Sequence, residues 1–187
     1  MLTLTQLWLP ILVSSIAVFL VSSVLHMVVQ WHKGDYKRLD KEDAVMDALR
    51  GFSIQPGEYM FPSCSSMKEF GSQEFMARLK RGPVGNLIVR PSTGVSMGKS
   101  LLQWFLFCVL VGVFVAYIMG LQTKAGAEGM LVFRVSSAIA ILGHAFWSVH
   151  TSIWKSIAWS TTFRFLVDGV IYGLVTGALF AWLWPAA

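Results

Sequence analysis

Four long apolar runs constrain the fold of this chain more than any other feature. Each run reaches or approaches the ~20 residues that an α-helix needs to cross the hydrocarbon core of a bilayer. The runs are Leu7–Trp31, Ser100–Leu121, Met130–Ile153 and Phe163–Trp184. Only 13% of the residues are charged, whereas a typical soluble domain has about 25%. The sequence therefore predicts an all-α membrane protein with four transmembrane helices.

The basic residues predict how these helices are oriented. Eleven of the 15 Lys and Arg lie between Trp31 and Lys99, and one, Lys124, lies between the second and third runs. Because short cytoplasmic loops carry an excess of basic residues, we expect residues 32–99 in the cytoplasm and both termini outside a bacterial inner membrane. The segment Met1–Gln6 lacks the basic residues of a signal peptide, so we expect an uncleaved first helix.

The net charge of +5 has its explanation in this topology. The basic residues gather on the expected cytoplasmic side and form no separate basic domain, so we expect the lipid bilayer, and no nucleic acid, as a partner. Residues 32–99 predict a small cytoplasmic α+β insertion, which divides the chain into 1–31, 32–99 and 100–187. Within the insertion we expect helices at Lys41–Arg50 and Met67–Lys80, the second one weakened by Gly71, and paired strands at Glu58–Phe61 and Leu87–Arg90.

The last apolar run carries two stripes of spaced residues. Gly169, Gly173 and Gly177 recur every four residues and so form one smooth face along a helix. Asp168 and Tyr172 begin a polar stripe one position earlier. We interpret the glycines as a helix-packing face, either within the bundle or between copies of the protein.

A carboxylate inside an apolar run is costly and needs a partner. With a rise of ~1.5 Å per residue, His26, His150 and Asp168 fall at about the same depth on the cytoplasmic side, and Tyr172 lies about one turn deeper. We therefore expect an intramembrane polar cluster of these four residues.

Several roles for this cluster remain open. We favour a structural hydrogen bond between Asp168 and a histidine or Tyr172. A proton or ion path, and a divalent-metal site made by two histidines and Asp168, are alternatives. A haem held by His26 together with His150 or His144 is a further alternative, which no motif supports. No cofactor is expected, and the identity of any metal is unknown.

Other patterns predict little chemistry. The segment from Gly94 to Ser100 resembles a phosphate loop, but three residues instead of four separate its two glycines. Cys64 and Cys108 lie in the insertion and in the second run, so no disulfide between them is expected. The nucleophile pattern Gly-x-Ser-x-Gly does not occur in the sequence.

Three segments carry a resemblance to a known group of proteins. They are His32–Tyr36, the Met97–Trp104 entry to the second run, and Trp159–Thr162 followed by Asp168-Gly169. In these segments the chain resembles uncharacterised proteobacterial inner-membrane proteins with four spans. The resemblance covers most of the chain and implies the same four-span architecture, and it brings no known activity, cofactor or site.

The leading hypothesis for function is a non-enzymatic accessory or structural subunit that packs through its glycine face. Its partner would be a second copy or another membrane protein. A small ion or proton conductor that uses the His/Asp cluster is the alternative, and a membrane enzyme acting on lipid or quinone is a third.

Overall fold

A computed structural model of the chain describes residues 1–94 and 96–187. Among these residues, four helical stretches are long and apolar enough to cross a membrane. They are Trp8–Val29, Met97–Gln122, Gly129–Lys155 and Trp159–Trp182. The predicted four spans are thereby confirmed, with shifts of a few residues at their ends, and the chain is a multi-pass integral membrane protein.

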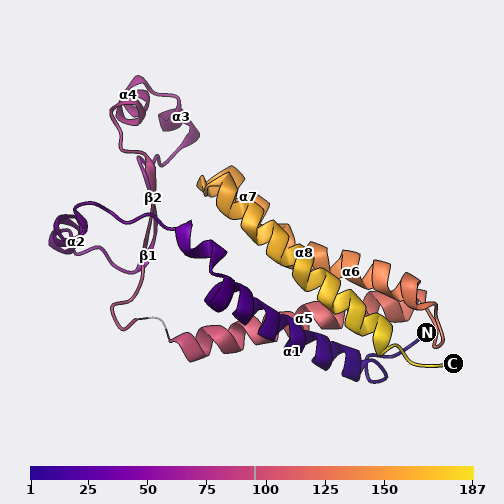
Figure 1. The fold of residues 1–187 in the computed structure, drawn as a ribbon. Coiled ribbons are helices and arrows are strands. Elements are labelled where there is room, and N and C mark those ends of the chain that lie inside the picture. The colour runs from indigo at the N-terminus through magenta and orange to yellow at the C-terminus, as the bar shows by residue number, and fades with distance from the viewer. Residues whose placement is uncertain (95) are drawn as a thin grey trace. The chain divides into compact units, whose positions relative to one another are not determined.

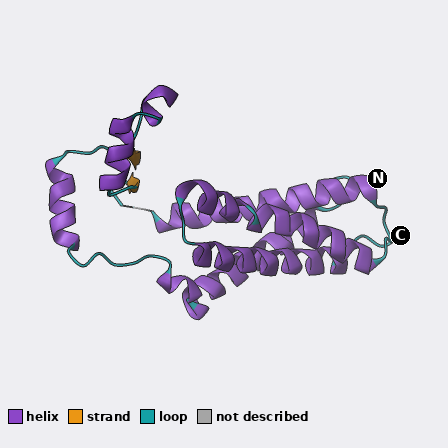
Figure 2. Cartoon of the chain, turned by 90° about the horizontal axis from the view of Figure 1, so that it is seen from above, coloured by secondary structure: helices purple, strands orange, loops and turns teal. Residues whose placement is uncertain are grey.

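The chain divides into two compact units. The first holds residues 1–37 and 96–187, and the second holds residues 38–95. Residues 32–37, which we expected in the insertion, lie with the helical unit because the chain folds back onto the last helix after the first span. Figure 2 shows that the strands belong to the second unit, while helices build the first.

The helical unit is built from α1 and the helices that follow the insertion (Figure 1). Their bounds are α1 Trp8–Val24, α5 Met97–Gln122, α6 Gly129–Ala145, α7 Trp147–Lys155 and α8 Trp159–Trp182. A π-helix, η1 (Leu25–Val29), continues α1, and a 3-10 helix, η2 (Trp31–Gly34), follows after the left-handed Gln30. Both termini lie at the same end of this unit. There the Leu2 N–H donates to the Gly120 carbonyl (3.1 Å) and the Gly126 N–H donates to that of Pro185 (2.8 Å).

The glycine face of α8 packs against α6 of the same chain. A Cβ added at Gly169 would lie 2.5 Å from the Cα atom of Ala145. One added at Gly173 would lie 2.8 Å from the backbone nitrogen of Ile141, and one at Gly177 would lie 2.7 Å from the Phe133 carbonyl oxygen. Real Cβ atoms do not approach this closely. The short distance between α6 and α8 is therefore possible only because these three positions are glycines, which have no side chain.

The described residues of the second unit form three helices and one antiparallel strand pair. Their bounds are α2 Glu42–Gly51, β1 Gly57–Phe61, α3 Met67–Phe70, α4 Gln73–Arg81 and β2 Gly85–Val89. Tyr59 stands opposite Leu87, which confirms the expected pairing. The helix predicted at Met67–Lys80 is two helices, because the chain breaks at Gly71 and the Ser72 side chain caps a new one.

Candidate functional site

The site begins where the first span ends and the chain reverses. The π-helical turn η1 carries His26, and Gln30 follows it in the left-handed conformation with φ 55°. The Gln30 N–H donates to the Leu25 carbonyl at 3.0 Å and so closes the end of the helix. The short helix η2 then places His32 beside His26, with the two rings stacked at 4.7 Å between centroids.

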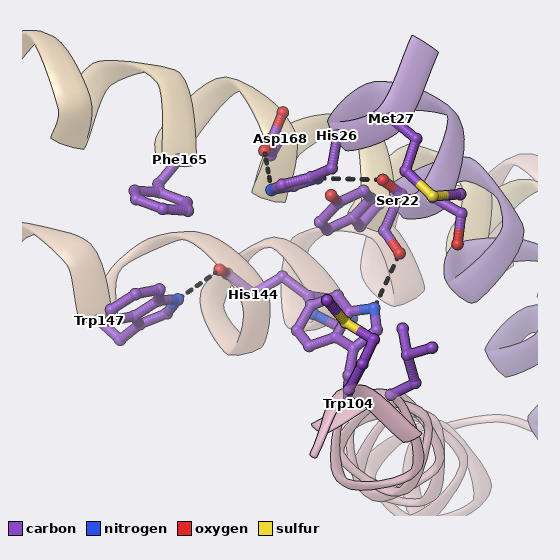
Figure 3. A pocket seen from close by; sticks show the side chains of 12 residues that line it. Ser22, His26, Met27, Trp104, His144, Trp147, Phe165 and Asp168 are labelled. Carbon is purple, nitrogen blue, oxygen red and sulfur yellow. Dashed lines mark hydrogen bonds and ion pairs between the residues drawn. The ribbon is translucent and has the colours of Figure 1, made fainter. Parts of the chain in front are cut away.

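Both histidines face Asp168 of α8. The Nε2 atom of His32 lies 2.8 Å from Asp168 Oδ2, and that of His26 lies 3.9 Å from the same oxygen. Figure 3 shows His26 reaching from the first span towards Asp168. Asp168 is only 2% exposed, so the two histidines take the place of water as its polar neighbours.

The other ring nitrogen of each histidine is held by an acceptor. Nδ1 of His32 lies 2.6 Å from Asp35 Oδ2, and Nδ1 of His26 lies 3.0 Å from the Ser22 carbonyl oxygen. A carbonyl oxygen only accepts hydrogen bonds, so Nδ1 of His26 carries the proton of that bond. The two rings are thereby oriented with both Nε2 atoms towards Asp168.

Asp35 is itself fixed from α8. Arg164 forms an ion pair with its carboxylate, and the Thr161 hydroxyl donates to Oδ1 at 3.1 Å. Burial raises the pKa of Asp35, but the hydrogen bonds from His32, Arg164 and Thr161 outweigh it and lower this pKa below its ordinary value. Asp35 is therefore a charged acceptor behind His32.

A pocket of about 430 Å³ opens beside the cluster. Its lining residues include Asp168, His26, Tyr172, Trp104 and Met27. Figure 3 shows the Trp104 indole N–H pointing to the Ser22 hydroxyl, to which it donates at 2.8 Å. Within the described chain, Asp168 Oδ1 and the Tyr172 hydroxyl are buried without a hydrogen-bond partner. Asp168 and Tyr172 therefore line the pocket, and each carries one unpaired polar atom that the surrounding side chains cover.

The structure brings together some of the predicted site residues and separates others. His26 lies beside Asp168, and Tyr172 lies one turn deeper on the same pocket, although its hydroxyl does not bond to Asp168. His150 is exposed on α7, and no hydrogen bond or ion pair joins it to Asp168 in the described chain. His144 is buried among aromatic rings, and the centroid of its ring lies 5.6 Å from the centroid of the Tyr172 ring.

His32 is the residue that sequence reasoning missed. It follows the first span, so a linear reading places it outside the membrane and away from Asp168. Only the reversal at Gln30 returns it to the bundle. One sequence signal could have found it. His26, His32 and Asp35 are potential ligands close together in the sequence, and Asp35 follows His32 by three residues, about one helical turn.

The cluster has the composition of a metal site. One possible ligand atom from each of His26, His32 and Asp168 lies within 4.8 Å of the others. Imidazole nitrogens and a carboxylate are ligands of zinc and of other divalent transition metals. A hydrogen-bond acceptor behind each ligating histidine is also usual in such sites, because it fixes the ring.

Comparisons with known proteins add no family to this description. No family model, curated protein or solved structure matches the chain. The chemistry of the site therefore has to be argued from its own geometry.

Proposed function

We propose that this integral membrane protein binds one divalent transition-metal ion of the zinc class through His26, His32 and Asp168. The ion would act as a Lewis acid towards an oxygen-bearing ligand in the adjacent pocket. The observation that carries this proposal is the orientation of the two imidazoles. Each is held at Nδ1, and both present Nε2 to one buried carboxylate.

Charge also supports the proposal. A buried carboxylate whose second oxygen has no partner is expensive in an apolar span, and a cation offsets this cost. Asp168 Oδ1 is such an oxygen. Metal binding would replace the proton on Nε2 of His32, as it does whenever histidine becomes a ligand.

The number of ligands points to a site that is open to other molecules. Structural zinc sites are closed by four protein ligands, whereas catalytic sites have three and leave one position free. Two of the three candidate ligands here, His26 and Asp168, line a pocket, so the free position would face that space. The His26 side chain is 43% exposed and has room to move the short distance towards Asp168.

The accessory-subunit hypothesis has less support from the described geometry. The glycines expected to receive a partner are covered by α6. A second copy or a membrane-complex partner would have to use another face of the bundle. We keep the bacterial inner membrane, with residues 32–99 in the cytoplasm, as the proposed location.

A proton or ion path is the other interpretation of the cluster. Such a path needs a continuous series of exchanging groups across the bundle. Ser14 and Ser15 donate to the Ile11 carbonyl oxygen, and Thr176 donates to that of Tyr172. These three hydroxyls are held by their own helices, whereas both imidazoles converge on one carboxylate, and the convergence supports binding more directly than conduction.

Metal titration of the full-length protein tests the proposal. Protein purified without a polyhistidine tag would be stripped of metal and titrated with Co²⁺ and Zn²⁺ in lipid nanodiscs. We expect one ion per chain, visible as Co²⁺ d–d absorption, and an affinity loss of at least about 100-fold in His32→Ala and Asp168→Ala.

His150→Ala is the matched control, because it removes an exposed histidine from the same protein. It should bind metal like the unmodified chain. Absence of saturable binding, or an equal loss in His150→Ala and His32→Ala, would reject the proposed metal site.

A further inference from the structure

The mouth of the pocket is lined by apolar side chains that the bundle leaves exposed. Met27 is 66% exposed, Met97 is 70% exposed and Leu101 is 42% exposed. All three belong to candidate membrane spans. Since lipid chains surround such a span, a molecule entering past these residues comes from the bilayer and not from water.

The inner wall of the pocket changes from apolar to polar. Trp104, Trp147 and Phe165 offer aromatic surface along its length. His26, Asp168 and Tyr172 supply the polar atoms. A pocket that is mostly apolar, with a few converging polar groups, is the usual form of a small-molecule site. This one suits an amphiphile whose polar end reaches the three residues.

The free polar atoms and the charge specify that polar end. A divalent ion with the carboxylates of Asp168 and Asp35 and the Arg164 guanidinium leaves a net positive charge, which favours an anionic oxygen ligand. Tyr172 is 3% exposed and lines the pocket, and its hydroxyl has no hydrogen-bond partner in the described chain. This hydroxyl is the group that would donate to an oxygen of the ligand once the ligand displaces the side chains that cover it.

The volume of the pocket restricts the apolar end. At about 430 Å³ it lies in the lower part of the ~300–1,000 Å³ range of sites for small molecules. We infer that the pocket takes a single-chain lipid with an anionic oxygen headgroup, a carboxylate or a phosphate, which ligates the metal and accepts a hydrogen bond from Tyr172. This inference rests on the proposed metal site.

Two single-chain probes test the inference in the Co²⁺-loaded protein, held in nanodiscs of zwitterionic lipid. The probes are dodecanoate and dodecyl phosphate. Either should change the Co²⁺ spectrum saturably, and the tighter of the two identifies the headgroup. Butyrate and inorganic phosphate lack the chain, and dodecyltrimethylammonium lacks the anionic oxygen, so all three should bind at least about tenfold more weakly or not at all.

Variants separate the pocket from the metal site. Leu101→Trp should narrow the mouth and weaken probe binding about tenfold, with Co²⁺ affinity unchanged. Leu110→Trp is its control, because Leu110 is an exposed residue of the same helix that does not line the pocket. Tyr172→Phe should also lose about tenfold in probe affinity, since it removes one hydrogen bond to a charged group.

Failure of the metal site and failure of the lipid inference give different results in these experiments. If Co²⁺ does not bind, the proposed metal site is wrong. If Co²⁺ binds but neither probe changes its spectrum, or if Leu101→Trp and Leu110→Trp behave alike, the metal site stands and the lipid inference is overturned. Equal binding of the cationic probe would overturn it as well.

Discussion

Asp35 illustrates how a residue outside the ligand set can determine the site. Its carboxylate touches no candidate metal position but accepts a hydrogen bond from His32 and is held by Arg164 and Thr161. A carboxylate behind a ligating histidine fixes both the ring and the nitrogen that faces the metal. We therefore regard Asp35 as a positioning residue.

Asp35→Asn should lower Co²⁺ affinity by about 10–100-fold while the protein stays folded. The neutral amide orients His32 less firmly and makes its imidazole a poorer ligand. Titration of Co²⁺ in nanodiscs measures the affinity, and the d–d spectrum reports a change in ligand geometry that a purely structural defect would not produce.

Asp47→Asn is the control, since Asp47 is an exposed partner of Arg50 in the other unit. Asp35→Glu should restore part of the affinity. Unchanged Co²⁺ binding in Asp35→Asn would remove Asp35 from the site.

At the same scale, sequence reasoning found two of the three candidate ligands. His26 and Asp168 were predicted because depth along a helix is linear in residue number. His150 satisfied the same depth argument but is exposed, because depth says nothing about the direction in which a side chain points. The spacing of His32 from His26 and Asp35 marks it as a possible ligand, but its place beside Asp168 could not be predicted, since a glutamine gives no warning that the backbone will turn left-handed.

The elements show why the long helices were predictable and their irregular ends were not. Twenty or more apolar residues specify a span whatever their order, so the four spans follow from composition. The π-helical turn η1 and the 3-10 helix η2 depend on how the chain packs against α8. Such irregular turns often occur at functional sites, and here they carry both histidines.

Gly173→Leu should destabilise the bundle by at least about 1–3 kcal/mol, because its side chain would collide with the Ile141 backbone on α6. Gly98→Leu in α5 is the matched control, since nothing lies within 4 Å of a Cβ added there. Unfolding of both variants in mixed micelles of increasing denaturing detergent measures the difference. Equal stability would show that the glycine face is not a packing surface.

The glycine face also links the fold to the site. Asp168 immediately precedes Gly169, so the close approach of α8 to α6 sets the position of the carboxylate. A moderate substitution such as Gly169→Ala, which displaces Ala145, should therefore affect the candidate metal site as well as stability. Helix packing and site geometry are not independent in this protein.

At the scale of the whole molecule, the structure of the two units can be predicted from the sequence to different extents. The helical unit follows from apolar length, and its core of Leu7, Val115, Met119 and Phe180 follows from which helices meet. Among the described residues of the second unit, Phe75 is the one large apolar side chain that is buried. Its strand pair was nevertheless predicted, because β-rich segments bounded by glycine and proline identify short strands.

The orientation in the membrane is a property of the whole chain, and its two cysteines can test it. Cys64 lies in the second unit and is partly exposed, whereas Cys108 is buried in α5. If the basic residues hold the second unit in the cytoplasm, a membrane-impermeant maleimide should label Cys64 in inside-out vesicles and leave intact spheroplasts unlabelled.

Cys64→Ser should abolish this labelling, and Cys108→Ser should leave it unchanged. Labelling of Cys64 in intact spheroplasts would reverse the predicted topology. The result also bears on the site, because the turn from His26 to Asp35 lies at the end of the first span that leads into the second unit. A cytoplasmic second unit would therefore place the candidate metal site at the cytoplasmic end of the first span.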